Sequence, residues 1–321
     1  MPIVPPPIPS AIHPARRALK PQHGSAHLPF SAILLIVLAS ACFSTVDVTV
    51  KLLSARYPVL LLVWARWSVQ ALVLVALLGP KMRLELFRTA HWPLHLVRGA
   101  VLILSSLCFY SALRFLPLAE ATALNYTSPI LVTLMASWLL HEPLTRPRWG
   151  FVAAGFLGML LVIRPGSAML TPASAFALGA AGLYAIFQIL TRRLAGENLM
   201  VLLLYPSLVG AVALSLAAAS VPATGVYPTS DLGAFIGIGV VGTVGHLLFT
   251  QAFQRASASA IAPFTYMQLV WSTLAGWVLF ATFPDGWTLT GIIVIAGSGV
   301  VLTWYERWRA SLPQSEPAAV D

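Results

Sequence analysis

Charged side chains are scarce in this sequence. They make up 9% of its 321 residues, whereas hydrophobic residues make up 58%, and a soluble domain typically has about 25% charged residues. A water-soluble fold of this length cannot cover so much apolar surface, so part of that surface must face lipid. The composition therefore predicts an integral membrane protein and excludes an ordinary soluble enzyme or binding domain.

Cysteine and the common cofactor motifs are also largely missing. Cys42 and Cys108 lie in apolar stretches without CxxC spacing, which excludes a disulfide framework and a structural zinc site. His91 and His95 are four residues apart but have no third ligand nearby, so we expect no metal. No Gly-Lys pair occurs, so the phosphate loop of a nucleotide-driven pump is absent. We expect no bound cofactor, and any transport would have to run on a gradient, by exchange or with a separate energising subunit.

The formal net charge of +9 is not gathered into one basic patch. Basic residues stand singly or in pairs between apolar runs, as they do in membrane proteins, so we expect no nucleic-acid partner. Residues 1–29 combine frequent prolines with Arg16, Arg17 and Lys20, which predicts a disordered cytoplasmic tail.

Ten apolar segments approach the roughly 20 residues that a helix needs to cross a bilayer. They are 31–53, 59–78, 96–113, 119–140, 149–163, 173–194, 199–219, 232–253, 259–280 and 288–304. The sequence thus predicts an all-α integral membrane protein with ten transmembrane helices.

Basic residues are distributed unequally between the two sets of alternating loops. One set holds Arg16, Arg17, Lys20, Lys81, Arg83, Arg88, Arg146, Arg148, Arg192, Arg193, Arg255, Arg307 and Arg309. The other set holds only Arg56, Arg114 and Arg164. Because positive loops stay in the cytoplasm, this bias predicts that both termini are cytoplasmic.

The second half of the chain repeats features of the first. A shift of 140 residues pairs Gly99 with Gly239, Ala112 with Ala252, and Tyr126 with Tyr266. Each half contains five spans, so the second half starts on the opposite side of the membrane and the repeats are inverted. The expected parts are a tail at 1–29, five-helix repeats at 30–165 and 173–305, and a tail at 306–321.

From residue 31 to residue 304 the sequence resembles the EamA family of the drug/metabolite transporter superfamily. The similarity is strongest at 110–164, where an A-L-x-x-x-P-x-x-x-A turn occupies 112–121 and Glu142 ends the fourth span. The second half departs from the family pattern at Thr282, where relatives have a second glutamate. The resemblance implies ten helices, cytoplasmic termini and gradient-driven movement of small solutes, and it leaves the substrate open.

Polar side chains at membrane depth are costly, so each is a candidate for solute binding. The candidates are Tyr110, Asn125, Tyr126, Tyr184, Gln188, His246, Tyr266, Gln268 and Trp271. Pro129 and Pro263 lie among them and free backbone carbonyls one turn earlier. The two prolines do not coincide under the repeat shift, so no equivalent kinks are expected. Hydrogen bonding between helices is the alternative role for each candidate.

Asp47 and Arg66 lie at similar expected depths on the first two spans. An unpaired charge at the bilayer centre costs about 2.5 to 3.5 kcal/mol on insertion scales, so we expect the two to be water-exposed or to form a gating or structural ion pair. Lys51, one helical turn from Asp47, is the rival partner.

The candidate cavity is rich in tyrosine, tryptophan and amides and poor in fixed charge, which suits zwitterionic or aromatic solutes better than polyanions. We expect a secondary transporter of the bacterial inner membrane that exports a small amino-acid-like metabolite. Uptake of a cofactor-type metabolite such as riboflavin or S-adenosylmethionine is the alternative. A membrane enzyme is less favoured because no catalytic set converges. The expected partners are a small-molecule solute and the lipid bilayer, with monomer and homodimer both open.

Overall fold

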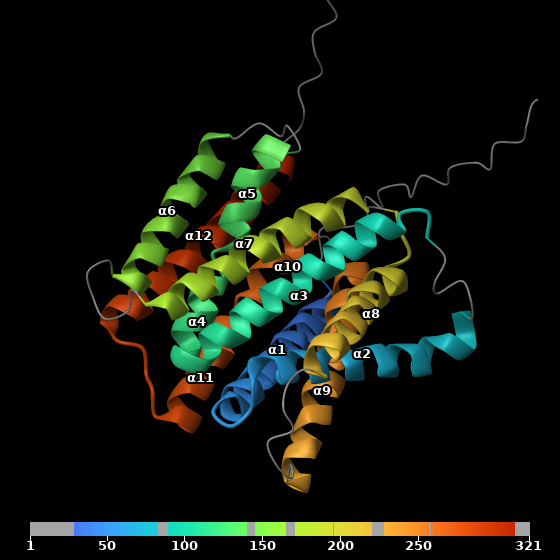
Figure 1. Cartoon of the computed structure of the whole chain (residues 1–321). Coiled ribbons are helices and arrows are strands. Elements are labelled where there is room, and N and C mark those ends of the chain that lie inside the picture. Colours follow the sequence, from blue (N-terminus) through green and yellow to red (C-terminus); the bar gives the residue numbers. More distant parts are fainter. Residues whose placement is uncertain are drawn as a thin grey trace, which may run out of the picture.

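The computed structural model describes residues 29–82, 89–139, 145–164, 171–194, 196–219, 228–256 and 258–311. Every regular element in these ranges is a helix (Figure 1). The expected tail up to residue 28, Glu142 and residues 312–321 lie outside the described residues.

Eight of the helices are long and apolar enough to cross a membrane. They are α1 (Phe30–Ser54), α2 (Val59–Met82), α3 (Trp92–Phe115), α6 (Arg146–Ile163), α7 (Pro172–Arg193), α8 (Leu199–Ala218), α9 (Thr229–Arg255) and α12 (Gly286–Ser311). Capping side chains mark two of the starts: Thr171 accepts from the Ser174 amide, and Asn198 accepts from the Met200 amide. The chain is therefore a multi-pass membrane protein.

The fourth and ninth expected spans are not single helices, which corrects the sequence prediction. The segment expected at 119–140 consists of α4 (Leu118–Asn125) and α5 (Ser128–Leu139). The segment expected at 259–280 consists of α10 (Ala258–Thr265) and α11 (Met267–Phe280). Apolar composition predicted the length of these segments, whereas the polar residues and prolines within them were interpreted as solute-binding candidates and not as breaks.

Helices from the two halves pack in matching pairs. Helix α1 packs on α9 as α7 packs on α3, α2 packs on α8, and α6 packs on α12. The short helices follow the same rule, because α5 contacts α7 and α11 contacts α1. Figure 1 shows α3 and α7 lying alongside each other, with α6 and α12 as a neighbouring pair. Exchanging the halves leaves this pattern of pairs unchanged.

Helices α6 and α12 run antiparallel and are tied at both ends. Arg148 at the start of α6 pairs with Glu306 near the end of α12, with a nitrogen–oxygen distance of 3.0 Å. Arg164 after α6 pairs with Asp285 before α12, at 2.6 Å. Between these contacts the helices cross at Gly158 and Gly291, where a Cβ on Gly291 would stand 2.6 Å from the carbonyl oxygen of Gly158.

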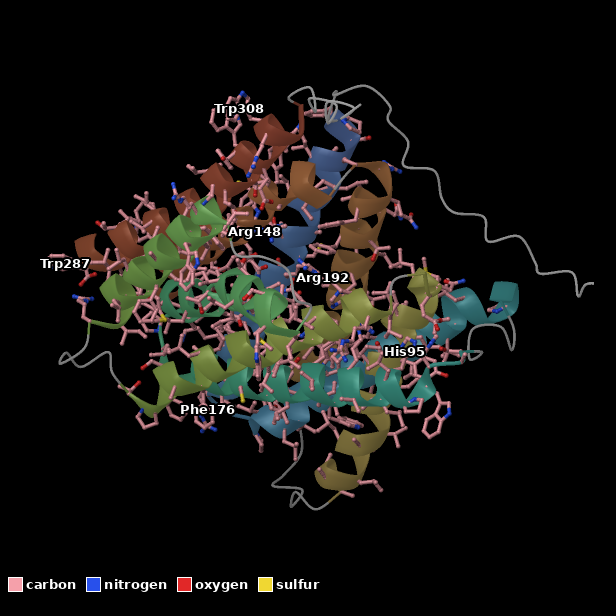
Figure 2. All side chains as sticks on the ribbon, turned by 90° about the horizontal axis from the view of Figure 1, so that it is seen from above. His95, Arg148, Phe176, Arg192, Trp287 and Trp308 are labelled. Atoms are coloured by element: carbon pink, nitrogen blue, oxygen red, sulfur yellow. The ribbon has the colours of Figure 1, made fainter. Side chains whose placement is uncertain are left out.

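Exposed tryptophans mark both ends of α12. Figure 2 shows Trp287 and Trp308 at opposite ends of this helix, and their side chains are exposed. At about 1.5 Å per residue, their separation matches a hydrocarbon core of about 30 Å. Tryptophan is enriched at both membrane interfaces, so these two residues are consistent with a helix that spans the bilayer.

The glycine crossing generates a stability prediction. Gly291→Ala places a methyl group against the Gly158 carbonyl, and such overpacking costs about 1–3 kcal/mol. We expect a lower melting temperature for the purified protein in detergent. Gly297→Ala, on the same helix with no atom within 4 Å of the added carbon, is the matched control and should melt at or above the wild-type temperature. Equal melting of the two variants would contradict the close crossing.

Candidate functional site

The two broken helices meet at a pair of tyrosines. Tyr126 follows α4, and Tyr266 stands between α10 and α11. Their ring centres lie 5.5 Å apart. These are the two tyrosines that the repeat shift pairs. The breaks thus fall at equivalent positions, although Pro129 follows the first break and Pro263 precedes the second.

Local hydrogen bonding explains both breaks. The Thr127 amide turns back to the Leu124 carbonyl at 3.1 Å, a tighter turn than an α-helix makes. Pro129, in the first turn of α5, has no amide hydrogen to continue the earlier helix. At the second break, Pro263 lies inside α10, and the carbonyl of Thr265 is left to accept from outside its helix.

A chain of hydrogen bonds joins the breaks to α1. The Tyr126 hydroxyl lies 2.7 Å from the Thr265 carbonyl oxygen and 3.1 Å from Gln268 Oε1. Gln268 Nε2 donates to Asp47 Oδ2 at 3.0 Å. One turn further along α11, Trp271 Nε1 donates to Ser40 Oγ at 3.2 Å. Four elements, α1, α4, α10 and α11, are therefore held together by polar side chains at membrane depth.

A second group of candidates surrounds Arg66 on α2. Its guanidinium lies 4.8 Å from the Trp67 ring centre and 5.8 Å from that of Tyr110. The Trp67 ring lies 6.3 Å from that of His246, which also contacts Phe43 at 5.0 Å. The field of Arg66 reaches Tyr184 and Asp47 as well, so this group adjoins the Tyr126–Gln268–Asp47 chain.

The remaining candidates lie around these groups. Asn125 closes α4, and its Oδ1 is buried without a hydrogen-bond partner. Tyr184 stacks on Phe187 with ring centres 5.6 Å apart. Gln188 lies one helical turn beyond Tyr184 on α7 and is half-buried. The structure thus brings the tyrosines, Gln268, Asp47, Arg66 and His246 to one region, with Gln188 on the same helix as Tyr184.

Neither expected ion pair of Asp47 forms. In the described ranges no ion pair within 4.0 Å joins Asp47 to Arg66 or to Lys51, and Asp47 instead accepts from Gln268. Lys51 Nζ donates to the carbonyl oxygens of Leu113 and Leu116, at 2.9 and 2.6 Å. These carbonyls have no partner within α3 because the helix ends there, which explains why Lys51 turns toward them.

Sequence reasoning missed one buried cation, Arg98 on α3. Its Nε donates to Thr191 Oγ1 at 2.7 Å, and its Nη1 donates to the Leu202 carbonyl at 2.9 Å. Its guanidinium also lies 4.4 Å from the Phe187 ring centre. Its position three residues inside an apolar run was the available signal, but its partners come from α7 and α8 and cannot be read from spacing.

Ion pairs close the helix ends around this region. Arg56 Nη1 lies 2.8 Å from Asp231 Oδ2, and the Tyr57 hydroxyl donates to the same carboxylate at 2.7 Å. At another helix start, His91 Nδ1 lies 3.0 Å from Glu197 Oε1. The hydrogen bond from His91, together with one from Thr89, holds the pKa of Glu197 below its usual range.

The described chain also has apolar hollows, which are separate from the polar region. One of about 390 Å³ is lined by side chains of α5, α6 and α7 together with Thr127. Another lies along α6 and α12. In the described ranges no group of three or more His, Cys, Asp or Glu side chains is placed to hold a metal ion.

Comparisons with known proteins bear on this arrangement. A model of the EamA-like transporter family matches residues 30–164 and 171–304. The pseudopaline exporter CntI of Pseudomonas aeruginosa is 32% identical over 281 residues, which cover 85% of this chain and 96% of that protein. The riboflavin transporter of Brucella anthropi is 28% identical over 83% of this chain and 96% of its own length.

More distant matches are consistent with these. The S-adenosylmethionine uptake transporter of Rickettsia bellii is 27% identical over 66% of this chain and 73% of its own length. A solved crystal structure superposes with a TM-score of 0.59 and 22% identity, covering 88% of this chain and 97% of that chain. At that identity the superposition supports the fold alone.

The hydrogen-bond chain predicts energetic coupling between Tyr126 and Gln268. Gln268→Leu leaves the Asp47 carboxylate without its donor and should cost about 1–3 kcal/mol, whereas Tyr126→Phe should cost about 0.5–1.5 kcal/mol. Because each substitution removes part of the same row of hydrogen bonds, the double variant should lose less stability than the sum of the two single losses. Trp271→Phe removes a separate hydrogen bond, so its loss of stability should add to that of Tyr126→Phe. The melting temperatures of wild type and the five variants in detergent measure these losses, and strict additivity for Tyr126→Phe and Gln268→Leu would contradict the hydrogen-bonded chain.

The contact of Asp285 with the Thr288 amide and Arg164 at the start of α12 predicts that the stability of the protein depends on pH. The Thr288 amide, and then Arg164, hold the pKa of Asp285 below its usual range, so its stabilising contribution is present at neutral pH and is lost as pH falls through the lowered pKa. Asp285→Asn should therefore melt below wild type at about pH 7, and the gap should close as the pH falls below about 3.9, the ordinary pKa value for Asp. Salt should narrow the gap because the group is exposed. A gap that widens on acidification would contradict this contact.

Proposed function

Because the chain belongs to the EamA-like transporter family, we propose that it is a secondary carrier that exports a small zwitterionic or aromatic, amino-acid-like metabolite from the bacterial cell. The observation that carries the proposal is the row of hydrogen bonds from Tyr126 through Gln268 to Asp47. It places hydroxyl, amide and carboxylate groups beside two helix breaks at membrane depth. Broken helices of this kind form the solute sites of many carriers built from repeats.

The proposed topology has ten crossings in two inverted repeats, at 30–165 and 173–305. Helices α4 and α5 together extend over residues 118–139, and α10 and α11 over 258–280, close to the roughly 20 residues of one crossing. The antiparallel course of α6 and α12, which occupy equivalent places in the two halves, supports inversion. The basic loops support cytoplasmic termini.

The aromatic and amide character of the site supports the choice of solute. Tyr110, Tyr126, Tyr184, Tyr266 and Trp271 present rings with polar tips, which suit a solute that is part apolar and part hydrogen-bonding. The P. aeruginosa relative is an exporter, which supports the outward direction.

Uptake of a cofactor-type metabolite is the second candidate. It is favoured by the riboflavin and S-adenosylmethionine transporters among the relatives. A carrier driven by gradients is reversible in principle, so the direction depends on the gradient that is coupled.

A comparison of metabolites in cells and medium tests both candidates. Strains with and without the gene are grown under identical conditions and profiled by mass spectrometry. We expect a compound in the medium only when the protein is present; a compound depleted from the medium would instead support uptake. Identical metabolite profiles in both strains, under conditions in which the protein is in the membrane, would contradict the proposal.

Site variants connect any such difference to the paired tyrosines. Tyr126→Ala and Tyr266→Ala should each reduce transport about tenfold, equivalent to about 1.4 kcal/mol, while the protein still inserts into the membrane. Phe115→Ala, which removes an aromatic ring that is 70% exposed, is the control and should transport like wild type. Normal transport by both tyrosine variants would place the site elsewhere.

A further inference from the structure

Among the described residues, the basic side chains of Lys51, Arg66 and Arg98 lie on helices at membrane depth, and the protein satisfies two of them. Lys51 donates to the carbonyls that end α3, and Arg98 donates to Thr191 and to the Leu202 carbonyl. Arg66 differs. Its Nε is buried without a hydrogen-bond partner, and within the described ranges it forms no ion pair. A charge at this depth requires a partner or water.

Aromatic rings lie against the Arg66 guanidinium, while its Nε donor has no protein acceptor. The rings of Trp67 and Tyr110 lie 4.8 and 5.8 Å from it, and guanidinium groups stack readily on aromatic faces. The Tyr110 hydroxyl is close enough to interact electrostatically with Arg66 but makes no hydrogen bond of acceptable geometry.

Other buried polar atoms nearby also lack a protein partner. They are Trp67 Nε1, Gln70 Oε1, Tyr110 Oη and His246 Nε2. Buried polar atoms are normally satisfied, and unsatisfied groups gathered around a single cation are typical of a site that receives a polar ligand. Asp47 interacts electrostatically with Arg66, but in the described ranges it forms no ion pair with Arg66 within 4.0 Å, and its Oδ2 accepts from Gln268 instead.

Helix α9 approaches this cation at a glycine. A Cβ on Gly242 would stand 3.5 Å from Arg66 Nε and 3.9 Å from Gln70 Oε1. A larger residue there would cover the guanidinium. Glycine therefore keeps space beside the unpartnered nitrogen.

We propose that Arg66 is the carboxylate-binding residue of the transport site, so that the solute carried bears a carboxylate. This rests on the proposed function as a solute carrier. A guanidinium matches a carboxylate with two parallel hydrogen bonds. A single guanidinium near the acid Asp47 suits a monoanionic carboxylate better than a phosphate, because the other nearby cation, Arg98, is already engaged by protein groups.

Binding of matched probes to the full-length protein in phospholipid nanodiscs tests this assignment. The probes are L-phenylalanine, 3-phenylpropionate, which lacks the ammonium group, and 2-phenylethylamine, which lacks the carboxylate. Tryptophan fluorescence reports binding because Trp67 adjoins Arg66. Wild type should bind both carboxylates, and Arg66→Gln should weaken both by about 10- to 100-fold without changing the affinity for 2-phenylethylamine.

Two further variants complete the design. Arg66→Lys keeps the charge but not the fork of donors, so its affinity for 3-phenylpropionate should lie between those of wild type and Arg66→Gln. Arg114→Gln removes an exposed arginine and should bind like wild type. Melting curves verify that the variants fold. If Arg66→Gln does not fold, the affinity of Arg66→Lys decides the test.

Specific results would overturn the assignment. One is wild-type affinity for 3-phenylpropionate in a folded Arg66→Gln, or in Arg66→Lys if the glutamine variant does not fold. Another is wild-type protein that binds neither carboxylate. An exported compound without a carboxylate would also overturn it while leaving transport intact. Identical metabolite profiles with and without the gene would instead contradict the proposed export. The binding data in nanodiscs would still decide the role of Arg66.

Discussion

Hydrocarbon offers no hydrogen-bond partner, so every polar group inside the membrane must find one within the protein or in a wet cavity. This constraint determines where the helices of this chain can break. The carbonyl of Thr265 at one break accepts from Tyr126 at the other, and the carbonyls that end α3 accept from Lys51 on α1. The break between α4 and α5 is satisfied locally, because the Thr127 hydroxyl donates to the Leu124 carbonyl at 2.7 Å. The break between α10 and α11 instead depends on Tyr126 from the other half of the chain.

Contacts at the helix ends also follow the repeat, but the acidic and basic partners trade places between the two halves. Arg56 pairs with Asp231 at the start of α9, and Glu197 pairs with His91 at the start of α3. The shift of 140 residues carries His91 onto Asp231 and carries Arg56 onto Gly196, next to Glu197. The same contact therefore recurs with acid and base reversed. One of the two contacts has a permanent charge pair, and the other is fully ionic only when His91 is protonated.

Much of the fold could be predicted from the sequence, because long apolar runs give long helices and the repeat shift identified Tyr126 and Tyr266 as equivalent. The breaks could not, since the polar residues at them are equally compatible with a continuous helix and Pro129 and Pro263 lie on different sides of the equivalent position. The departure from the family pattern at Thr282 has a local explanation in the structure. Its amide and hydroxyl both bond to the Gly276 carbonyl, at 3.0 Å each, and so terminate α11. Lys51 donates to the carbonyls at the end of α3, and Arg98 donates to the Thr191 hydroxyl and the Leu202 carbonyl. No spacing in the sequence reveals these partners.

The contacts between the halves differ in how firmly they are held. Helices α6 and α12 carry an ion pair at each end and a glycine crossing between them, so sliding of this pair would break two ion pairs and separate a close backbone contact. The α1–α9 and α3–α7 pairs each have an ion pair that closes one helix start, at Asp231 and at His91. Opening one of these starts breaks one ion pair and leaves the other in place. In the proposed carrier, alternating access to Tyr126 and Arg66 would require least disruption if α6 and α12 stayed fixed and the two helix starts opened in turn.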